Sequence, residues 1–317
     1  MQFNNKQILI TDNIHNLLID KLKEYGFIII QKLNITRTEL KQILPDFEGI
    51  IIRSKIIFDK ELLEVACNLR FIARAGSGME NIDVDLARNK GIECINSPEG
   101  NRDSVGEHTI GLILSLLHNI NIADKEIKQQ KWDRYKNRVN EIQGKIIGII
   151  GYGNTGSAFA KKVKSLGAEI IAYDKYKSNF SDEFVKEVTM NDIFKYSDIV
   201  SLHIPLTSET KYLVDNVFFN SFTNNIIFVN TSRGPIVDTH ALVMAIKSGK
   251  VVAAGLDVLE YEGIAFESLN ISDNEDYNFL CQTEKIIMTP HIAGLSYQSE
   301  KRHAEILAEK IIKLLNR

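Results

Sequence analysis

The sequence predicts an α/β protein built from two doubly wound parallel-sheet domains with a cleft between them. Short apolar runs of strand length alternate with segments of helical period, which is the pattern of parallel sheets flanked by helices. A buried strand that runs into a glycine turn, Lys145–Gly156, begins almost halfway along the 317 residues. Because such a turn usually opens a nucleotide-binding domain, the residues before it are expected to form another unit.

The first part of the chain is expected to alternate strands with amphipathic helices. The strands are expected at Gln7–Thr11, Phe27–Gln31, Gly49–Arg53, Phe71–Arg74 and Gly91–Asn96. The helices are expected near Ile14–Tyr25, Arg37–Ile43, Asp59–Ala66 and Val84–Asn89. A long helical stretch from about Arg102 to Gln129, with Asp103 and Ser104 as capping residues, then leads toward the glycine turn.

The second part repeats the alternation and ends in a helix. Its strands are expected at Ile146–Ile150, Glu169–Tyr173, Ile199–His203, Asn225–Asn230, Val251–Asp257 and Lys285–Met288. Glu262–Thr283 is polar and acidic and is interpreted as a loop or insertion, and Tyr297–Leu315 is an amphipathic helix. We expect a nucleotide domain over residues 103–290, and a substrate domain made of 1–102 and 291–317, so that the chain crosses between the domains twice.

The glycine turn predicts a dinucleotide site. Gly151 allows the tight turn, Gly153 lets the backbone approach a pyrophosphate, and Gly156 allows close packing of the following helix, Thr155–Leu166. The next strand delivers Asp174, where a carboxylate can accept both ribose hydroxyls of NAD. An ordinary strand–helix–strand unit ending in a solvated aspartate is the alternative.

Composition excludes several classes of function. The 38 basic and 41 acidic residues leave a net charge of −3, without a basic block among aromatics, so no nucleic-acid partner is expected. The apolar runs are too short for a membrane span, and no secretory signal is recognisable. Cys67, Cys94 and Cys281 lack metal-ligand spacing, so no metal is expected; they favour a reducing cytoplasm and are interpreted as core residues.

Polar residues at strand ends in the second part suggest a catalytic site. Arg233, Asp257, Glu262 and His291 all lie at or beyond the carboxyl ends of expected strands, at the edge where open α/β sheets bind ligands. A histidine is suited to move the hydroxyl proton in hydride transfer, and a carboxylate beside it would orient the ring. An arginine fork would bind a substrate carboxylate and polarise the carbonyl. Each residue alone also fits a surface or packing role.

Several segments together resemble the D-isomer-specific 2-hydroxyacid dehydrogenases over nearly the whole chain. These segments are Arg74–Gly78, Asn96–Asn101 with Ser104–His108, the glycine turn, His203–Thr207, Asn230–Gly234, Leu256–Val258 and Thr289–His291. The resemblance implies a flavodoxin-like substrate domain and a Rossmann NAD-binding domain. It also implies that Arg233, Glu262 and His291 are the catalytic arginine, glutamate and histidine.

The resemblance also implies binding residues. The backbone amides of Ser77 and Gly78 would hold the substrate carboxylate, and cofactor contacts are implied at Thr207, Thr231 and Asp257. Two features depart from the family. Asn154 and Thr155 stand where arginine and isoleucine are common, although both still offer backbone amides. The spacing between Glu262 and His291 is long, which indicates an insertion beside the site.

Within the family the chain looks closest to D-3-phosphoglycerate dehydrogenases, which begin serine biosynthesis and act on 3-phosphoglycerate and 3-phosphohydroxypyruvate. Arg53, Arg74 and a partner subunit's Arg134 match basic positions around the phosphate, with solvated arginines as the alternative. The resemblance implies a homodimer or higher oligomer and a short form without the regulatory domain. A reductase of glyoxylate, hydroxypyruvate or D-lactate-like acids, and a dinucleotide-sensing binding protein, remain as alternatives.

Overall fold

The computed structural model describes residues 7–263 and 268–316, which divide into two compact units. The first unit comprises Met1–Asn101, Gly263–Ser268 and Leu295–Arg317, and the second comprises Arg102–Glu262 and Leu269–Gly294. One sheet has five strands and the other has seven, and the strands within each pair in parallel. The predicted class, α/β with two parallel-sheet domains, is confirmed.

The first unit has the strand order β2-β1-β3-β4-β5. Its strands are β1 (Gln7–Ile10), β2 (Ile28–Gln31), β3 (Gly49–Ile52), β4 (Phe71–Arg74) and β5 (Glu93–Ile95). Its helices are α1 (Asn16–Glu24), α2 (Arg37–Ile43), α3 (Lys60–Val65), α4 (Val84–Asn89) and α12 (Tyr297–Leu315), with a 3₁₀ turn at Leu44–Asp46. This is the flavodoxin-like order, and its direction reverses between β1 and β3, where such sheets bind ligands.

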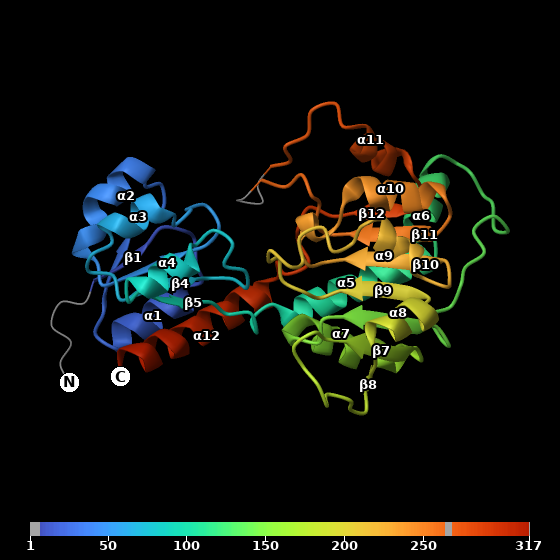
Figure 1. The fold of residues 1–317 in the computed structure, drawn as a ribbon. Helices are drawn as coiled ribbons and strands as arrows, with labels where there is room; N and C mark the ends of the chain where they lie inside the picture. Colours follow the sequence, from blue (N-terminus) through green and yellow to red (C-terminus); the bar gives the residue numbers. More distant parts are fainter. Residues whose placement is uncertain (1–6, 264–267, 317) are drawn as a thin grey trace. The chain divides into compact units, whose positions relative to one another are not determined.

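Both faces of this sheet are covered by helices. On one face, Leu18 and Leu22 of α1 and Leu307 and Ile311 of α12 pack on β1, β3 and β4. The other face packs against α2, α3 and α4. Figure 1 shows α12 beside α1, so helices from both ends of the chain contribute to the same core.

The second unit has the strand order β12-β11-β10-β9-β6-β7-β8. Its strands are β6 (Ile146–Ile150), β7 (Glu169–Tyr173), β8 (Lys186–Glu187), β9 (Ile199–Leu202), β10 (Ile226–Asn230), β11 (Val251–Leu256) and β12 (Ile286–Met288). The order reverses between β6 and β9, as in a Rossmann domain, so the glycine turn after β6 lies at the switch point.

Helices cover both faces of the second sheet as well (Figure 1). They are α5 (Arg102–Leu117), α6 (Ile120–Lys128), α7 (Asn154–Val163), α8 (Met190–Tyr196), α9 (Asn216–Asn220), α10 (Thr239–Lys247) and α11 (Glu275–Gln282), with 3₁₀ turns at Lys164–Leu166 and Gly234–Ile236. Helices α5 and α7 pack on one face, and α8 to α11 on the other. Continuous apolar strands such as β6 are explained by this two-sided burial.

Three expectations need correction. The long helix expected over residues 102–129 is two helices, because Asn119 adopts a left-handed conformation (φ 51°) that asparagine tolerates better than most residues. The stretch interpreted as a loop or insertion contains α11, capped at its start by the Asn274 side chain. Cys67 and Cys281 are exposed and are therefore not core residues.

The chain's last crossing between the units falls after Gly294, whereas the sequence suggested that this crossing follows residue 290. The Asp257 carboxylate accepts hydrogen bonds from the backbone amides of Ile292 (2.9 Å) and Ala293 (2.8 Å). These bonds tie His291–Gly294 to the end of β11 in the second unit. Among the helices of the described residues, not one is both long and apolar enough to cross a membrane.

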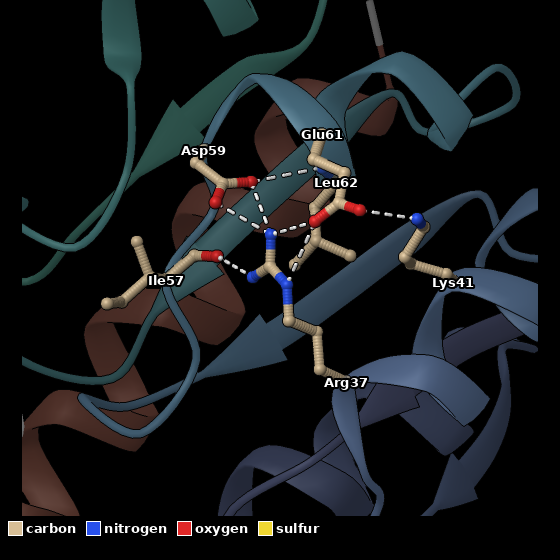
Figure 2. A network of polar contacts seen from close by, with 6 residues as sticks. All are labelled: Arg37, Lys41, Ile57, Asp59, Glu61 and Leu62. Carbon is tan, nitrogen blue, oxygen red and sulfur yellow. Dashed lines mark hydrogen bonds and ion pairs between the residues drawn. The ribbon is translucent and has the colours of Figure 1, made fainter.

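An exposed ion-pair network joins α2 to the start of α3 (Figure 2). The Arg37 guanidinium contacts the carboxylates of Asp59 (2.6 Å) and Glu61 (2.9 Å), and Lys41 contacts Glu61 (2.6 Å). Arg37 holds the pKa of the Asp59 carboxyl below its usual range. The pKa of Asp59 is thus lower in the folded than in the unfolded protein, where it is about 3.9. The contribution of the ion pair to stability is therefore fully present above about pH 3.9, and it is lost as the pH falls through the folded-state pKa.

Asp59 has a second role, because its side chain accepts a hydrogen bond from the Leu62 amide and caps α3. We expect Asp59→Ala to lower the free energy of unfolding by about 1 kcal/mol at neutral pH. Asp59→Asn keeps a capping oxygen and removes only the exposed ion pair, so this variant should lose less than about 1 kcal/mol of its free energy of unfolding. Urea unfolding of both variants measures the difference; equal losses would assign the effect to the charge instead of the cap.

Candidate active site

The glycine turn is shaped by close backbone approaches. Gly151 has φ 95°, and a Cβ there would lie 2.5 Å from the His203 carbonyl oxygen at the end of β9. A Cβ on Gly156 would overlap the Gly151 carbonyl oxygen. Glycine at these two positions therefore lets α7 start directly against the turn and lets the turn lie against β9.

The start of α7 suits an anion. Gly153 is the N-cap of α7 and offers no side-chain cap, and a Cβ on Gly153 would meet no atom within 4 Å. No side chain caps the first amides of the helix, and the helix dipole favours negative charge there. The Thr155 hydroxyl bonds the ring of buried His203 (3.2 Å). Burial lowers the pKa of His203 to about 3, so this ring stays neutral.

Asp174 lies beside the turn at the end of β7. Its carboxylate accepts hydrogen bonds from the Tyr152 amide (2.8 Å) on one oxygen and from the Tyr176 (2.9 Å) and Lys177 (3.1 Å) amides on the other. The Lys177 ammonium in turn donates to the Tyr152 carbonyl (2.8 Å). These bonds fix Asp174, the residue expected at the ribose, relative to the glycine turn, which is expected at the pyrophosphate. A pyrophosphate and an adjoining ribose diol fit these residues.

The structure brings Glu262 and His291 together. The His291 Nδ1 lies 2.7 Å from Glu262 Oε2, and the Leu259 amide donates to the other oxygen (2.5 Å). Because a carboxylate only accepts hydrogen bonds, Nδ1 must carry the proton in this pair. In the neutral ring, Nε2 is then the nitrogen that can take up a proton.

His291 has a backbone conformation that is uncommon for its residue type. Its φ is 55°, and its amide donates to the Asp257 carbonyl (2.8 Å). Asp257 is buried, and its carboxylate accepts from Thr289 Oγ1 (2.6 Å) as well as from the Ile292 and Ala293 amides. Asp257 therefore holds the loop that presents His291, a role that sequence reasoning missed. Local strain of this kind is found where tertiary structure fixes a functional side chain.

Arg233 follows β10 in a loop that is closely packed. Its carbonyl accepts from the Asn230 side-chain amide (3.0 Å), and its own guanidinium donates to the Ser232 carbonyl (2.7 Å). A Cβ on the next residue, Gly234, would overlap the carbonyl of Leu259, the residue whose amide binds Glu262. The Arg233 loop and the Glu262 loop are thus in backbone contact. This contact gives no recognisable signal in the sequence.

Thr231 and Thr207 are engaged within the protein. The Thr231 hydroxyl lies 3.1 Å from the hydroxyl of Thr109 in α5. The Thr207 amide donates to the Thr210 hydroxyl (2.8 Å), which closes a turn after β9. His108 Nε2 lies 3.0 Å from Thr289 Oγ1, so His108 is another member of the site that was not singled out.

In the first unit, the loop after β4 is held from two sides. The Asn96 side-chain amide donates to the Ser77 carbonyl (2.5 Å), and the Ser77 hydroxyl donates to Asn101 (2.8 Å). Arg74 is buried, and its guanidinium lies against Gly76, where a Cβ would overlap it. Ser77, Gly78 and Arg74 therefore belong to one short, braced segment.

Arg53 lines a cavity of about 130 Å³ at the switch point of the first sheet, with Asn13, His15, Ala75 and Glu300. Its guanidinium lies 3.5 Å from a Glu300 oxygen and 3.5 Å from the Asn13 carbonyl. Arg134 is exposed and belongs to the second unit. The structure thus places Arg53 and Arg74 in the same unit and Arg134 in the other.

Residues 110–293 match the family model of the D-isomer specific 2-hydroxyacid dehydrogenase, NAD binding domain. The chain belongs to this family. The predicted resemblance is confirmed, and the glycine turn, Asp174, Arg233, Glu262 and His291 all lie within the matched NAD-binding domain.

Relatives of this dehydrogenase family differ in length and in name. A D-3-phosphoglycerate dehydrogenase of Archaeoglobus fulgidus is 36% identical over 97% of this chain, which spans 57% of that protein. A hydroxypyruvate reductase of Thermotoga maritima is 36% identical over 89% of each chain. The crystal structure of an Aquifex aeolicus D-lactate dehydrogenase, complexed with NAD and lactic acid, matches with a TM-score of 0.81 at 24% identity over 98% of this chain and 96% of that one. This last similarity establishes the fold.

Proposed function

We propose that the chain is an NAD-dependent dehydrogenase of D-2-hydroxy acids. The observation that carries this proposal is the 2.7 Å pair of Glu262 and His291 at the strand ends of the NAD-binding unit. When bound, the nicotinamide cofactor supplies the hydride for reduction of a 2-keto acid, or accepts it in the reverse direction. The residues of the chain must then bind the acid and move one proton.

His291 moves that proton. In the oxidation of a hydroxy acid, Nε2 accepts the hydroxyl proton, and in reduction the same atom returns it to the carbonyl oxygen. The imidazolium that carries the proton is stabilised by the Glu262 carboxylate at Nδ1. Glu262 thus keeps the ring oriented and makes its charged form easier to reach.

Arg233 binds the acid and stabilises charge on its reacting oxygen. A guanidinium matches a carboxylate with paired hydrogen bonds, and it favours negative charge that develops on a carbonyl oxygen as hydride arrives. We propose that the backbone amides of Ser77 and Gly78 bind a carboxylate of the substrate, because the bracing of their loop holds these amides in one conformation.

The proposed substrate is 3-phosphohydroxypyruvate, with 3-phosphoglycerate as the reduced acid. Two observations support it: Arg53 lines a cavity at the switch point of its sheet, and several relatives named D-3-phosphoglycerate dehydrogenase cover most of this chain. A second anion on the substrate needs its own donors, and an arginine fork supplies them. The second candidate is hydroxypyruvate, because the Thermotoga maritima relative matches this chain over 89% of both lengths.

Initial rates with NADH and a panel of 2-keto acids test both candidates. We expect the highest kcat/KM for the phosphorylated acid over hydroxypyruvate, glyoxylate and pyruvate. Faster reduction of hydroxypyruvate would establish the second candidate. Binding of NADH without turnover of any acid in the panel would favour a dinucleotide-sensing protein.

Arg53→Ala should lower kcat/KM for the phosphorylated acid by about 10- to 150-fold, because a charged hydrogen bond contributes roughly 1.5–3 kcal/mol. The effect on glyoxylate should be small, since that acid has no phosphate. The backbone amide of Arg53, which donates to Asp12 (2.9 Å), is unchanged by the substitution. Equal losses on both substrates would make Arg53 a structural residue.

We propose further that two copies of the chain associate through α6 and the segment after it. Large apolar side chains gather there on the surface: Trp132 is 80% exposed, Tyr135 84%, Ile120 52% and Ile127 51%. Exposed apolar patches mark interaction sites. Arg134 lies between Trp132 and Tyr135 in the sequence, so we propose that it contacts the partner subunit. A cytoplasmic location is proposed as well, because two of the three cysteines are exposed thiols.

Sedimentation velocity measures the association. We expect the wild type to sediment as a dimer at micromolar concentration, and Trp132→Ala to weaken dimerisation by about tenfold or more, as buried interface tryptophans do. Val217→Ser, which changes a 72% exposed apolar side chain on α9, is the matched control and should leave the mass unchanged. A monomeric wild type would contradict the proposal.

A further inference from the structure

Two loops at the carboxyl edge of the second sheet are joined by an ionic contact. The Lys175 ammonium, just after β7, lies 2.6 Å from Glu209 Oε2 in the loop after β9. The Tyr176 hydroxyl donates to the same oxygen, and the ammonium lies 5.5 Å from the Tyr176 ring centroid. One carboxylate therefore binds both residues that follow Asp174.

Glu209 is carried by a turn with its own hydrogen bonds. The Thr210 hydroxyl donates to the Pro205 carbonyl (2.7 Å), and the Thr210 amide donates to the Thr207 carbonyl (3.2 Å). These bonds hold the turn without help from Lys175. The backbone that carries Glu209 is therefore held in place by the turn itself.

The position of Lys175 makes this contact significant for the cofactor. In dinucleotide-binding domains, an acid at the end of the second strand accepts the ribose hydroxyls of NAD, and a basic residue nearby accommodates the 2′-phosphate of NADP. This chain has both types side by side, Asp174 and Lys175. The other nearby lysine, Lys177, already donates to the Tyr152 carbonyl.

We infer that Glu209 is a specificity-determining residue, which draws Lys175 away from the ribose 2′ position and so strengthens the preference for NAD over NADP. The inference rests on the proposed function, since it concerns the same nucleotide site. Lys175 and Glu209 are both charged at neutral pH: the ammonium holds the pKa of the Glu209 carboxyl below its usual range, and the carboxylate raises the pKa of Lys175.

Substitution Glu209→Gln removes the charge and keeps an oxygen that accepts from Tyr176. Lys175 then becomes available to a 2′-phosphate. Because both side chains of the pair are more than half exposed, the gain is that of an exposed ion pair. We expect NADP to bind about three- to fivefold more tightly, with less than a twofold change for NAD.

Calorimetric titration of the full chain with NAD and with NADP, without substrate, tests the inference independently of turnover. Lys175→Met added to Glu209→Gln should abolish the gain, whereas Lys175→Met alone should change NADP binding little. About 0.5 M salt should also remove the gain. Glu107→Gln removes an equal charge from another lysine contact of this unit, with Lys162 at 3.0 Å, and should change neither affinity.

An unchanged NADP affinity in Glu209→Gln would overturn the inference. So would parallel changes for both dinucleotides, because these would indicate a loosened loop instead of a redirected lysine. If the wild type binds neither dinucleotide, the proposed function fails together with the inference. Wild-type binding of NAD with an unresponsive Glu209→Gln variant refutes the inference alone.

Discussion

His291→Ala is expected to lower kcat by about 10²- to 10⁴-fold while NADH still binds with nearly wild-type affinity. The imidazole moves the substrate proton, and proton transfer by a placed side chain contributes this much to rate. The cofactor is expected to depend on other groups, the amides at the start of α7 and Asp174. Single-turnover rates and NADH fluorescence titration measure the two effects separately.

A variant that keeps more than about a tenth of the wild-type kcat would remove His291 from the mechanism. Glu262→Gln serves as the companion variant. The amide still offers an oxygen to Nδ1 but lacks the negative charge that favours the imidazolium, so kcat should fall. An unchanged kcat would show that Glu262 does not assist His291.

Gly234→Ala is expected to lower kcat/KM by on the order of 10²-fold, although Gly234 has no proposed contact with substrate. An added Cβ would overlap the Leu259 carbonyl, so the Arg233 loop and the Glu262 loop must separate. A displacement of about 1 Å in positioned catalytic groups costs this much in rate. The overlap should also destabilise the protein by about 1–3 kcal/mol, as overpacking does.

Gly111→Ala is the matched control for that substitution. Gly111 lies within α5, and a Cβ there would meet no atom within 4 Å. Since alanine is a better helix former than glycine, this variant should keep full activity and gain up to about 1 kcal/mol of stability. If Gly234→Ala is destabilised but its kcat/KM is unchanged at a temperature where it is folded, the contact supports the fold and does not position the site.

The sequence by itself predicted the α/β architecture and singled out Glu262 and His291, which the structure brings together. Strand-length apolar runs such as Ile146–Ile150 indicate burial on both faces of a parallel sheet. The spacing of Gly151, Gly153 and Gly156 indicates a tight backbone turn that other residue types rarely form. The carboxyl ends of parallel strands meet at one edge, so His291 and Glu262 were expected together despite their separation in the chain. These features are local patterns with a fixed geometric meaning.

The tertiary structure alone decided how those residues are held. Asp257 binds the loop of His291, Gly234 lies against the Leu259 carbonyl, and Glu209 reaches Lys175, yet each pair is far apart in sequence or has no periodic signal. The break at Asn119 likewise depends on a single residue adopting a left-handed conformation inside an otherwise helical pattern. Such contacts depend on the distance between loops after the sheet has formed, and that distance is set by the packing of the whole unit.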